Sequence, residues 1–143
     1  SEIIAAFLYA QLENIDLITA RRRDIFEHYA TALTPLAERG LMRIPGLSGD
    51  MQTNYHIFYM ILENEETRNS LMDHLKSCGI LAVFHYVPLH TSPMGVSMGY
   101  TEGQLPVTES LSGRLLRLPF YYELKRDDQD YVIDCIRGFF GRA

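Results

Sequence analysis

The sequence of 143 residues predicts an α+β domain, in which a small sheet of about three strands is covered by helices on one face. Three observations point to this class. Apolar residues recur at intervals of three and four over a long first segment, which is typical of an amphipathic helix. Three short runs rich in β-branched, aromatic or leucine residues follow it. Helical segments separate these runs, so we expect a layered domain led by a long helix.

The first predicted helix covers residues 2 to about 38, and Gly40 suits the position just after its C-terminus. The residues Asn14-Ile15-Asp16 are expected to bend this helix or divide it in two. We expect residues 1–40 to link to a preceding domain and residues 41–143 to form the C-terminal α+β domain. The apolar first turns would then pack on that preceding domain or on a second subunit.

The remaining elements alternate after a loop marked by Pro45-Gly46 and Ser48-Gly49-Asp50. The predicted strands cover residues 54–62, 80–84 and 115–119. The predicted helices begin at Asn64, at Pro106, and at Asp127 or Asp128. Within the first strand, His56 is interpreted as a half-buried imidazole with satisfied hydrogen bonds.

Composition argues against several classes of function. The net charge of −5 disfavours a nucleic-acid-binding surface, which is usually basic. The single basic cluster, Arg21–Arg23, has acidic neighbours and is interpreted as a solvated helix face rather than a phosphate site. No stretch of about 18 apolar residues occurs, so no membrane span is predicted. Cys78 and Cys135 stand in apolar helical settings, which favours free thiols in a reducing, cytoplasmic compartment.

The segment His85-Tyr86-Val87-Pro88-Leu89-His90 carries the strongest functional signal. It places two imidazoles and a phenol at the end of a predicted strand and the start of a long loop. Such loops often present side chains to a ligand. Two readings stay open from the residues alone: the rings contact a ligand, or they satisfy local hydrogen bonds. Combining these histidines with Cys78 would give too few ligands at too wide a spacing for zinc, so no metal is expected.

An ordered set of motifs spans nearly the whole chain. It consists of Ser1–Ala6, Gln11-Leu12, Arg21–Arg23, Tyr29, Gly79-Ile80, His85–His90, Gly99-Tyr100, Leu105–Glu109 and Leu118-Pro119. This set resembles the C-terminal part of the DegT/DnrJ/EryC/StrS family, the pyridoxal-phosphate-dependent sugar aminotransferases. Ala82–Phe84 and Thr91–Gly95 are most similar to the members that aminate TDP-4-keto-6-deoxy-glucose for enterobacterial common antigen. Tyr122 departs from the pattern, because the family commonly carries a proline near this position.

The resemblance implies the small C-terminal domain of a fold-type I aminotransferase that acts as a homodimer. The reaction would transfer an amino group from glutamate, through pyridoxal phosphate, to the 4-keto carbon of a dTDP-linked 4-keto-6-deoxy sugar. Under this reading His85, Tyr86 and His90 line the sugar-nucleotide site, and Pro88 holds the loop between them. The cofactor would be bound mainly by an upstream domain.

The resemblance also implies that the Schiff-base lysine belongs to that upstream domain. The chain has two lysines, Lys76 and Lys125, and neither stands in the sequence context of the family's lysine. No catalytic residue is therefore expected in this chain, and the isolated chain should be inactive. The alternative is a non-enzymatic module that binds a ligand or mediates dimerisation.

Overall fold

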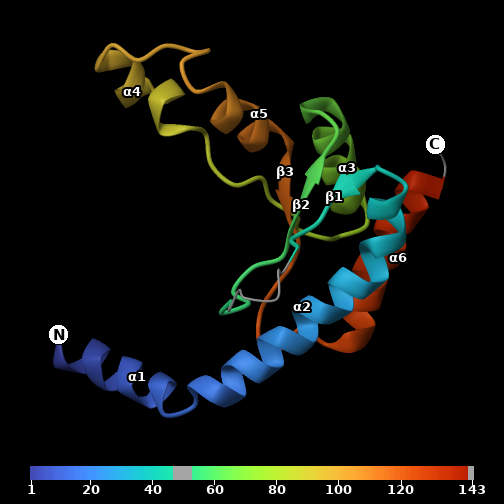
Figure 1. Cartoon of the computed structure of the whole chain (residues 1–143). Helices are drawn as coiled ribbons and strands as arrows, with labels where there is room; N and C mark the ends of the chain where they lie inside the picture. The colour runs from blue at the N-terminus through green and yellow to red at the C-terminus, as the bar shows by residue number, and fades with distance from the viewer. Residues whose placement is uncertain (47–52, 142–143) are drawn as a thin grey trace.

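The computed structural model describes residues 1–46 and 53–141 and has the predicted α+β class. The predicted loop at Ser48–Asp50 lies outside these residues. Figure 1 shows the helices and strands in chain order. Their bounds are α1 Glu2–Leu12, α2 Ile15–Glu38, β1 Met42–Arg43, β2 Tyr59–Leu62, α3 Glu65–Ser77, η1 Leu89–Thr91, α4 Pro93–Ser97, α5 Pro106–Arg114, β3 Leu115–Arg117 and α6 Arg126–Gly141.

The sheet has three antiparallel strands in the order β1-β2-β3. Met42 pairs with Leu62, and Met60 pairs with Leu116. Alternate residues of the β2 segment point to opposite faces. Phe58, Met60 and Leu62 are buried, whereas the residues between them are partly exposed. One face of the sheet therefore forms the floor of the core, as the sequence predicted.

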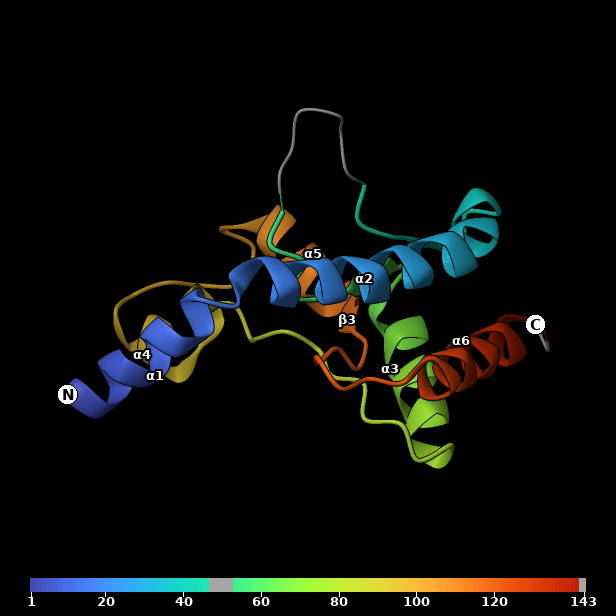
Figure 2. The ribbon, with the colours of Figure 1, turned by 90° about the horizontal axis from the view of Figure 1, so that it is seen from below.

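Helices α2, α3 and α6 cover this floor (Figure 2). Each contributes fully buried apolar side chains, namely Ile25, Tyr29 and Leu33 from α2, Leu71 and Leu75 from α3, and Ile133 and Ile136 from α6. The Tyr29 hydroxyl donates to the Pro119 carbonyl at 3.1 Å. Burial raises the pKa of the Tyr29 phenol far above its ordinary value, so this group stays a neutral donor. The core thus joins the second half of α2 to the sheet.

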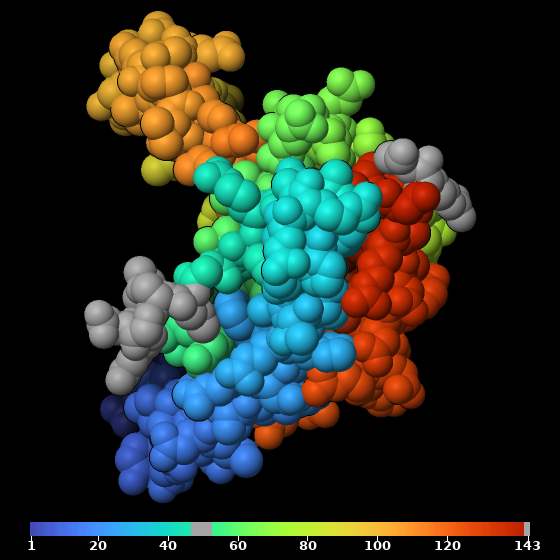
Figure 3. Space-filling model, turned by 45° about the vertical axis from the view of Figure 1, so that its right-hand side comes forward, coloured from blue at the N-terminus to red at the C-terminus, as the bar shows by residue number. Residues whose placement is uncertain are grey.

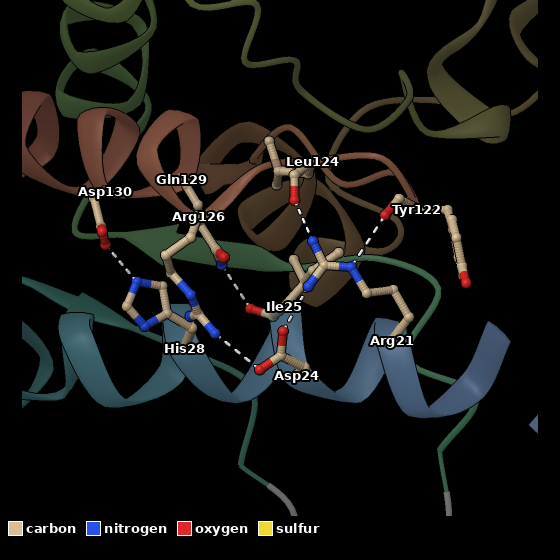
Figure 4. Close-up of polar contacts among 9 residues, drawn as sticks. All are labelled: Arg21, Asp24, Ile25, His28, Tyr122, Leu124, Arg126, Gln129 and Asp130. Carbon is tan, nitrogen blue, oxygen red and sulfur yellow. Dashed lines mark hydrogen bonds and ion pairs between the residues drawn. The ribbon is translucent and has the colours of Figure 1, made fainter. Parts of the chain in front are cut away.

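Polar contacts fasten α2 to α6 beside this core (Figure 4). Asp24 bridges two guanidinium groups, Arg21 at 2.6 Å and Arg126 at 2.8 Å. Arg21 also donates to the carbonyls of Tyr122 and Leu124, which fixes the turn before α6. This first arginine of the basic cluster is therefore a structural residue rather than a solvated one.

Two further contacts extend this joint along the helices. The buried Gln129 amide donates to the Ile25 carbonyl at 2.7 Å. His28 pairs with Asp130 at 2.5 Å, so it contacts α6 rather than a neighbour on its own helix. The joint thus combines one buried hydrogen bond with partly exposed ion pairs.

Several sequence predictions need correction. The first helix is divided at Glu13-Asn14, as expected, and the two parts meet at 65°. The predicted strand at 80–84 is wrong: within it only Val83 pairs with the sheet, in a single bridge to Arg117 at the edge of β3. The third strand of the sheet is instead the two-residue β1, at the opposite edge, where it pairs with β2. The predicted strand at 54–62 is regular only over its last four residues, because Tyr55 has φ +49°. Asp127 and Asp128 lie within the first turn of α6, which begins at Arg126.

Two parts of the molecule project from the compact body on the same side. One is α1, and the other is a segment that we call the arm, residues 85–105, which contains η1 and α4 (Figure 1). Figure 3 shows the arm standing out from the body at the top of the molecule. In the described part of the chain no single helix is long and apolar enough to cross a membrane; only α1 and α2 taken together, across their bend, have that length and composition.

Candidate functional site

The arm is built from local turns. A backbone bridge between Val83 and Arg117 ties its start to the edge of β3. Pro88 then stiffens the backbone before η1, and the Ser92 hydroxyl caps α4 by accepting from the Gly95 amide at 3.1 Å. Gly95 is buried against η1, where a Cβ atom would lie 2.5 Å from the His90 carbonyl oxygen. Only glycine fits this close approach of two backbones.

The Glu109 carboxylate, on α5, holds the two ends of the arm together. Its Oε1 lies 2.7 Å from His90 Nε2. It also accepts hydrogen bonds from the backbone amides of Gly103 at 2.9 Å and Leu105 at 3.2 Å. The hydrogen bond with His90 and these two amides hold the pKa of Glu109 below its usual range. The carboxylate is therefore ionised at neutral pH and orders the arm as a charged acceptor.

His85 and Tyr86 lie at the base of the arm and are both exposed. Their rings meet edge to face with 4.7 Å between centroids. The Arg117 guanidinium lies 5.9 Å from the Tyr86 ring, within the range of a cation–π contact. The Ser112 hydroxyl donates to the Tyr86 carbonyl at 2.6 Å, so α5 also fixes the backbone at this point.

Tyr86 lines a hollow of about 500 Å³ between α3, α5 and the base of the arm. Its wall also includes Phe84, Asn69, Ser112 and the carboxylates Glu65, Glu102 and Glu109. A hollow of this size matches those that hold small molecules. Aromatic faces beside carboxylate, amide and hydroxyl groups suit a polyhydroxylated ligand, because sugar hydroxyls can donate to the oxygens while the ring packs on a face.

Arg68 forms the inner wall of this hollow and is only 6 % exposed. Its guanidinium donates to Glu65 at 3.1 Å and lies 5.3 Å from the Phe84 ring. Its Nε has no hydrogen-bond partner within the described residues. A buried arginine braced in this way positions Glu65 and Phe84 for whatever enters the hollow.

The structure separates the three predicted site residues. Tyr86 lines the hollow just described, and His85 stacks on it. His90 is 6 % exposed and turned inward to Glu109, and it lines a second, mostly apolar hollow of about 590 Å³ beneath α4. Of the two interpretations that the sequence leaves open, local hydrogen bonding describes His90, whereas the side chains of Tyr86 and His85 are accessible to a ligand. Binding by any of the three stays a prediction.

The sequence reading missed Arg68 and Glu109 as members of the site. Arg68 lies in α3, and its i, i+3 spacing from Glu65 is the signal that the sequence offers for it. Glu109 stands in the sequence only as part of the Leu105–Glu109 motif, because its partners His90 and Gly103 come from a loop whose path the sequence does not reveal. Both act through contacts between elements distant in sequence.

The residues present do not fit a covalent pyridoxal site. Lys76 lies in the last turn of α3 and Lys125 precedes α6, and both side chains are exposed. Neither lines the hollow at Tyr86. Across residues 1–46 and 53–141, no group of three or more histidine, cysteine or acidic side chains is placed to hold a metal ion.

Comparisons with known proteins agree on one family. The model of the DegT/DnrJ/EryC1/StrS aminotransferase family matches residues 1–137. The chain is 34 % identical over 140 residues to the pleiotropic regulatory protein of Geobacillus stearothermophilus, covering 97 % of this chain and 37 % of the relative. It is also 34 % identical over 143 residues to a dTDP-3-amino-3,4,6-trideoxy-alpha-D-glucose transaminase of Streptomyces venezuelae, covering 99 % and 36 %.

A solved structure extends this likeness to the fold. The Streptomyces venezuelae protein DesV, crystallised in complex with a ketimine intermediate, superposes with a TM-score of 0.85 at 32 % identity. The match covers 97 % of this chain and 36 % of that one. The chain therefore spans little more than a third of the length of the relatives that it matches.

Proposed function

The chain belongs to the DegT/DnrJ/EryC1/StrS aminotransferase family, and from this premise we propose that it is the C-terminal domain of a sugar aminotransferase that depends on pyridoxal phosphate. The proposed reaction moves an amino group from glutamate to the 4-keto carbon of a dTDP-linked 4-keto-6-deoxy sugar. The similarity of Ala82–Phe84 and Thr91–Gly95 to the enzymes of enterobacterial common antigen supports this choice of substrate.

The hollow beside Tyr86 is the observation that carries the proposal. It is open, of small-molecule size, and combines aromatic faces with carboxylate, amide and hydroxyl groups. In our proposal Tyr86 and His85 form the wall that contacts the sugar part of the substrate. His90 does not contact the sugar in this proposal; it holds the arm in place through its hydrogen bond with Glu109. The relative that acts on a dTDP-amino sugar supports the same class of ligand.

The proposed cofactor would be held by a domain upstream of this chain. When bound, pyridoxal phosphate supplies the carbonyl carbon through which an amino group passes from donor to acceptor. The exposed apolar side chains of α1 would pack on that domain or on the second subunit of a homodimer. We propose the cytoplasm as the compartment, because Cys78 and Cys135 are both free thiols.

The test uses the full-length enzyme that contains this chain. The wild type should be yellow and lose this absorbance on reduction with borohydride, whereas the isolated chain should retain no pyridoxal phosphate after gel filtration. His85→Ala and Tyr86→Ala should lower kcat/KM for the nucleotide sugar about tenfold or more, as loss of one or two ligand contacts does. The half-reaction with glutamate should change little.

Tyr121→Ala is the matched control, because this tyrosine is about half exposed in the turn before α6, outside the wall of the hollow. It should leave kcat/KM unchanged. Wild-type kinetics in both variants of the hollow would refute the assignment of the wall. A full-length protein that forms no Schiff base would instead favour the non-enzymatic module.

A further inference from the structure

Tyr55 is the one non-glycine residue with positive φ in the described part of the chain, at +49°. A bulky aromatic residue in this region of backbone conformation is strained. Such strain persists only where the surroundings enforce it, and it concentrates at functional sites.

Contacts with α2 hold the Tyr55 ring in place. The ring meets Phe26 edge to face, with 5.4 Å between centroids. The Arg23 guanidinium lies 5.3 Å from the centre of the same ring. The Tyr55 amide also donates to the Thr53 hydroxyl at 3.2 Å. With the ring turned inward onto the helix, the residues on either side of Tyr55 are turned outward.

Those two residues, Asn54 and His56, are exposed and joined to each other. His56 Nδ1 lies 2.6 Å from the Asn54 amide oxygen. An amide oxygen can only accept, so Nδ1 carries the proton and donates. Nε2 is then the free ring nitrogen, and the hydrogen bond fixes the ring that carries it. His56 is thus an oriented, exposed imidazole, not the half-buried strand residue that the sequence predicted.

The charges around His56 favour an anion as its ligand. Arg23 places a guanidinium beside this turn, and its own side chain is exposed. A ring protonated at Nε2 can donate a charge-assisted hydrogen bond to a phosphate oxygen, and Arg23, on the Tyr55 ring of the same turn, adds a second positive charge nearby. The turn lies on the side of the body from which α1 and the arm project (Figure 1).

We propose that His56, oriented by Asn54 and assisted by Arg23, binds a phosphate group of a ligand of this domain. The inference deepens the proposed function, on which it rests, because both the nucleotide-sugar substrate and pyridoxal phosphate carry phosphate. It also revises the interpretation of the basic cluster: Arg21 fixes the turn before α6, and Arg23 serves the phosphate.

The experiment compares His56→Ala and Arg23→Ala with the wild type in the full-length enzyme. Two equilibrium measurements are made on each protein: the Kd for pyridoxal phosphate and the Kd for thymidine diphosphate. Loss of a charge-assisted hydrogen bond should weaken one of them about tenfold or more. A weakened thymidine diphosphate Kd alone assigns the substrate diphosphate, and a weakened cofactor Kd alone assigns the cofactor phosphate.

Two further variants separate this role from a structural one. His56→Gln keeps a donor near the position of Nε2 and should recover part of the lost affinity. His28→Ala removes a histidine that pairs with Asp130 at the α2–α6 joint, and it should leave both Kd values unchanged. Neither measurement needs turnover, so failure of the proposed transamination would not mask the result. Wild-type Kd values for both ligands in His56→Ala would overturn the proposal.

Discussion

The body of the domain and its two projections use apolar residues in opposite ways. In the body, the apolar residues of α2, α3, α6 and the sheet are buried in one cluster. In α1 and the arm, large apolar side chains stay exposed: Ile3, Ile4, Phe7, Leu8 and Leu12 of α1, and Leu89, Met94, Val96 and Met98 of the arm. The body is thus stabilised by its own core, whereas the projections are ordered by turns, caps and one carboxylate. Surfaces of this kind are typical of contacts with another domain or subunit.

A matched pair of leucine substitutions gives the largest contrast between these regions. Leu33→Ala, in α2, opens a cavity at a fully buried position and should lower the free energy of unfolding by about 2–5 kcal/mol. Leu8→Ala, in α1, changes a side chain that is 56 % exposed and should cost no more than about 0.5 kcal/mol. Urea denaturation followed by circular dichroism measures both. Equal losses would show that α1 is packed in solution.

Gly95→Ala should separate the arm from the body. The new Cβ would meet the His90 carbonyl, a backbone atom that cannot move aside, and overpacking of this kind costs about 1–3 kcal/mol. Amide exchange should accelerate in α4, where the Tyr100 amide donates to the Gly95 carbonyl, while exchange in the core stays slow. Gly138→Ala is the control: it meets nothing within 4 Å in α6, and its helix propensity adds up to about 1 kcal/mol of stability. Faster exchange throughout α2 and α6 in Gly95→Ala would mean that arm and body unfold together.

Glu109→Gln tests whether one carboxylate orders the arm. The amide keeps the shape but removes the charge, so the amides of Gly103 and Leu105 and the ring of His90 lose a charge-assisted acceptor. The backbone amide hydrogens of Gly103 and Leu105 should therefore exchange faster than in the wild type. Ser110→Ala, at the next position of α5, should leave this exchange unchanged.

The same carboxylate predicts a pH dependence. The folded-state pKa of Glu109 is lower than its ordinary value of 4.5. Its contribution is therefore complete above pH 4.5 and is lost as the pH falls through the lowered value. Exchange at Gly103 should accelerate in that acid range in the wild type and show no such step in Glu109→Gln. A step retained in the variant would assign it to another group.

The body was more predictable from the sequence than the projections, for a physical reason. Periodic apolar residues such as Leu71 and Leu75 predict a buried helix face. Gly40 and Gly79 mark helix ends, where they adopt φ of +77° and +75°. The strained turn at Tyr55 and the inward turn of His90 are set by contacts with Phe26 and Glu109, which lie far away in sequence. Local sequence patterns do not indicate which distant residues will be in contact. The candidate site therefore needed the structure, although Tyr86 could be named beforehand.

Asp24→Asn should have only a small effect, even though the residue bridges two arginines. Its side chain is about half exposed, and exposed ion pairs contribute about 0–1 kcal/mol. The loss should fall within that range and shrink further in high salt, which screens the wild-type pairs. Asp134→Asn, whose partner Arg137 lies 3.7 Å away at a more exposed position, should cost still less. A loss for Asp24→Asn well above 1 kcal/mol that persists in high salt would contradict this. The α2–α6 joint would then depend on its charges rather than on the buried Gln129 and the core beneath it.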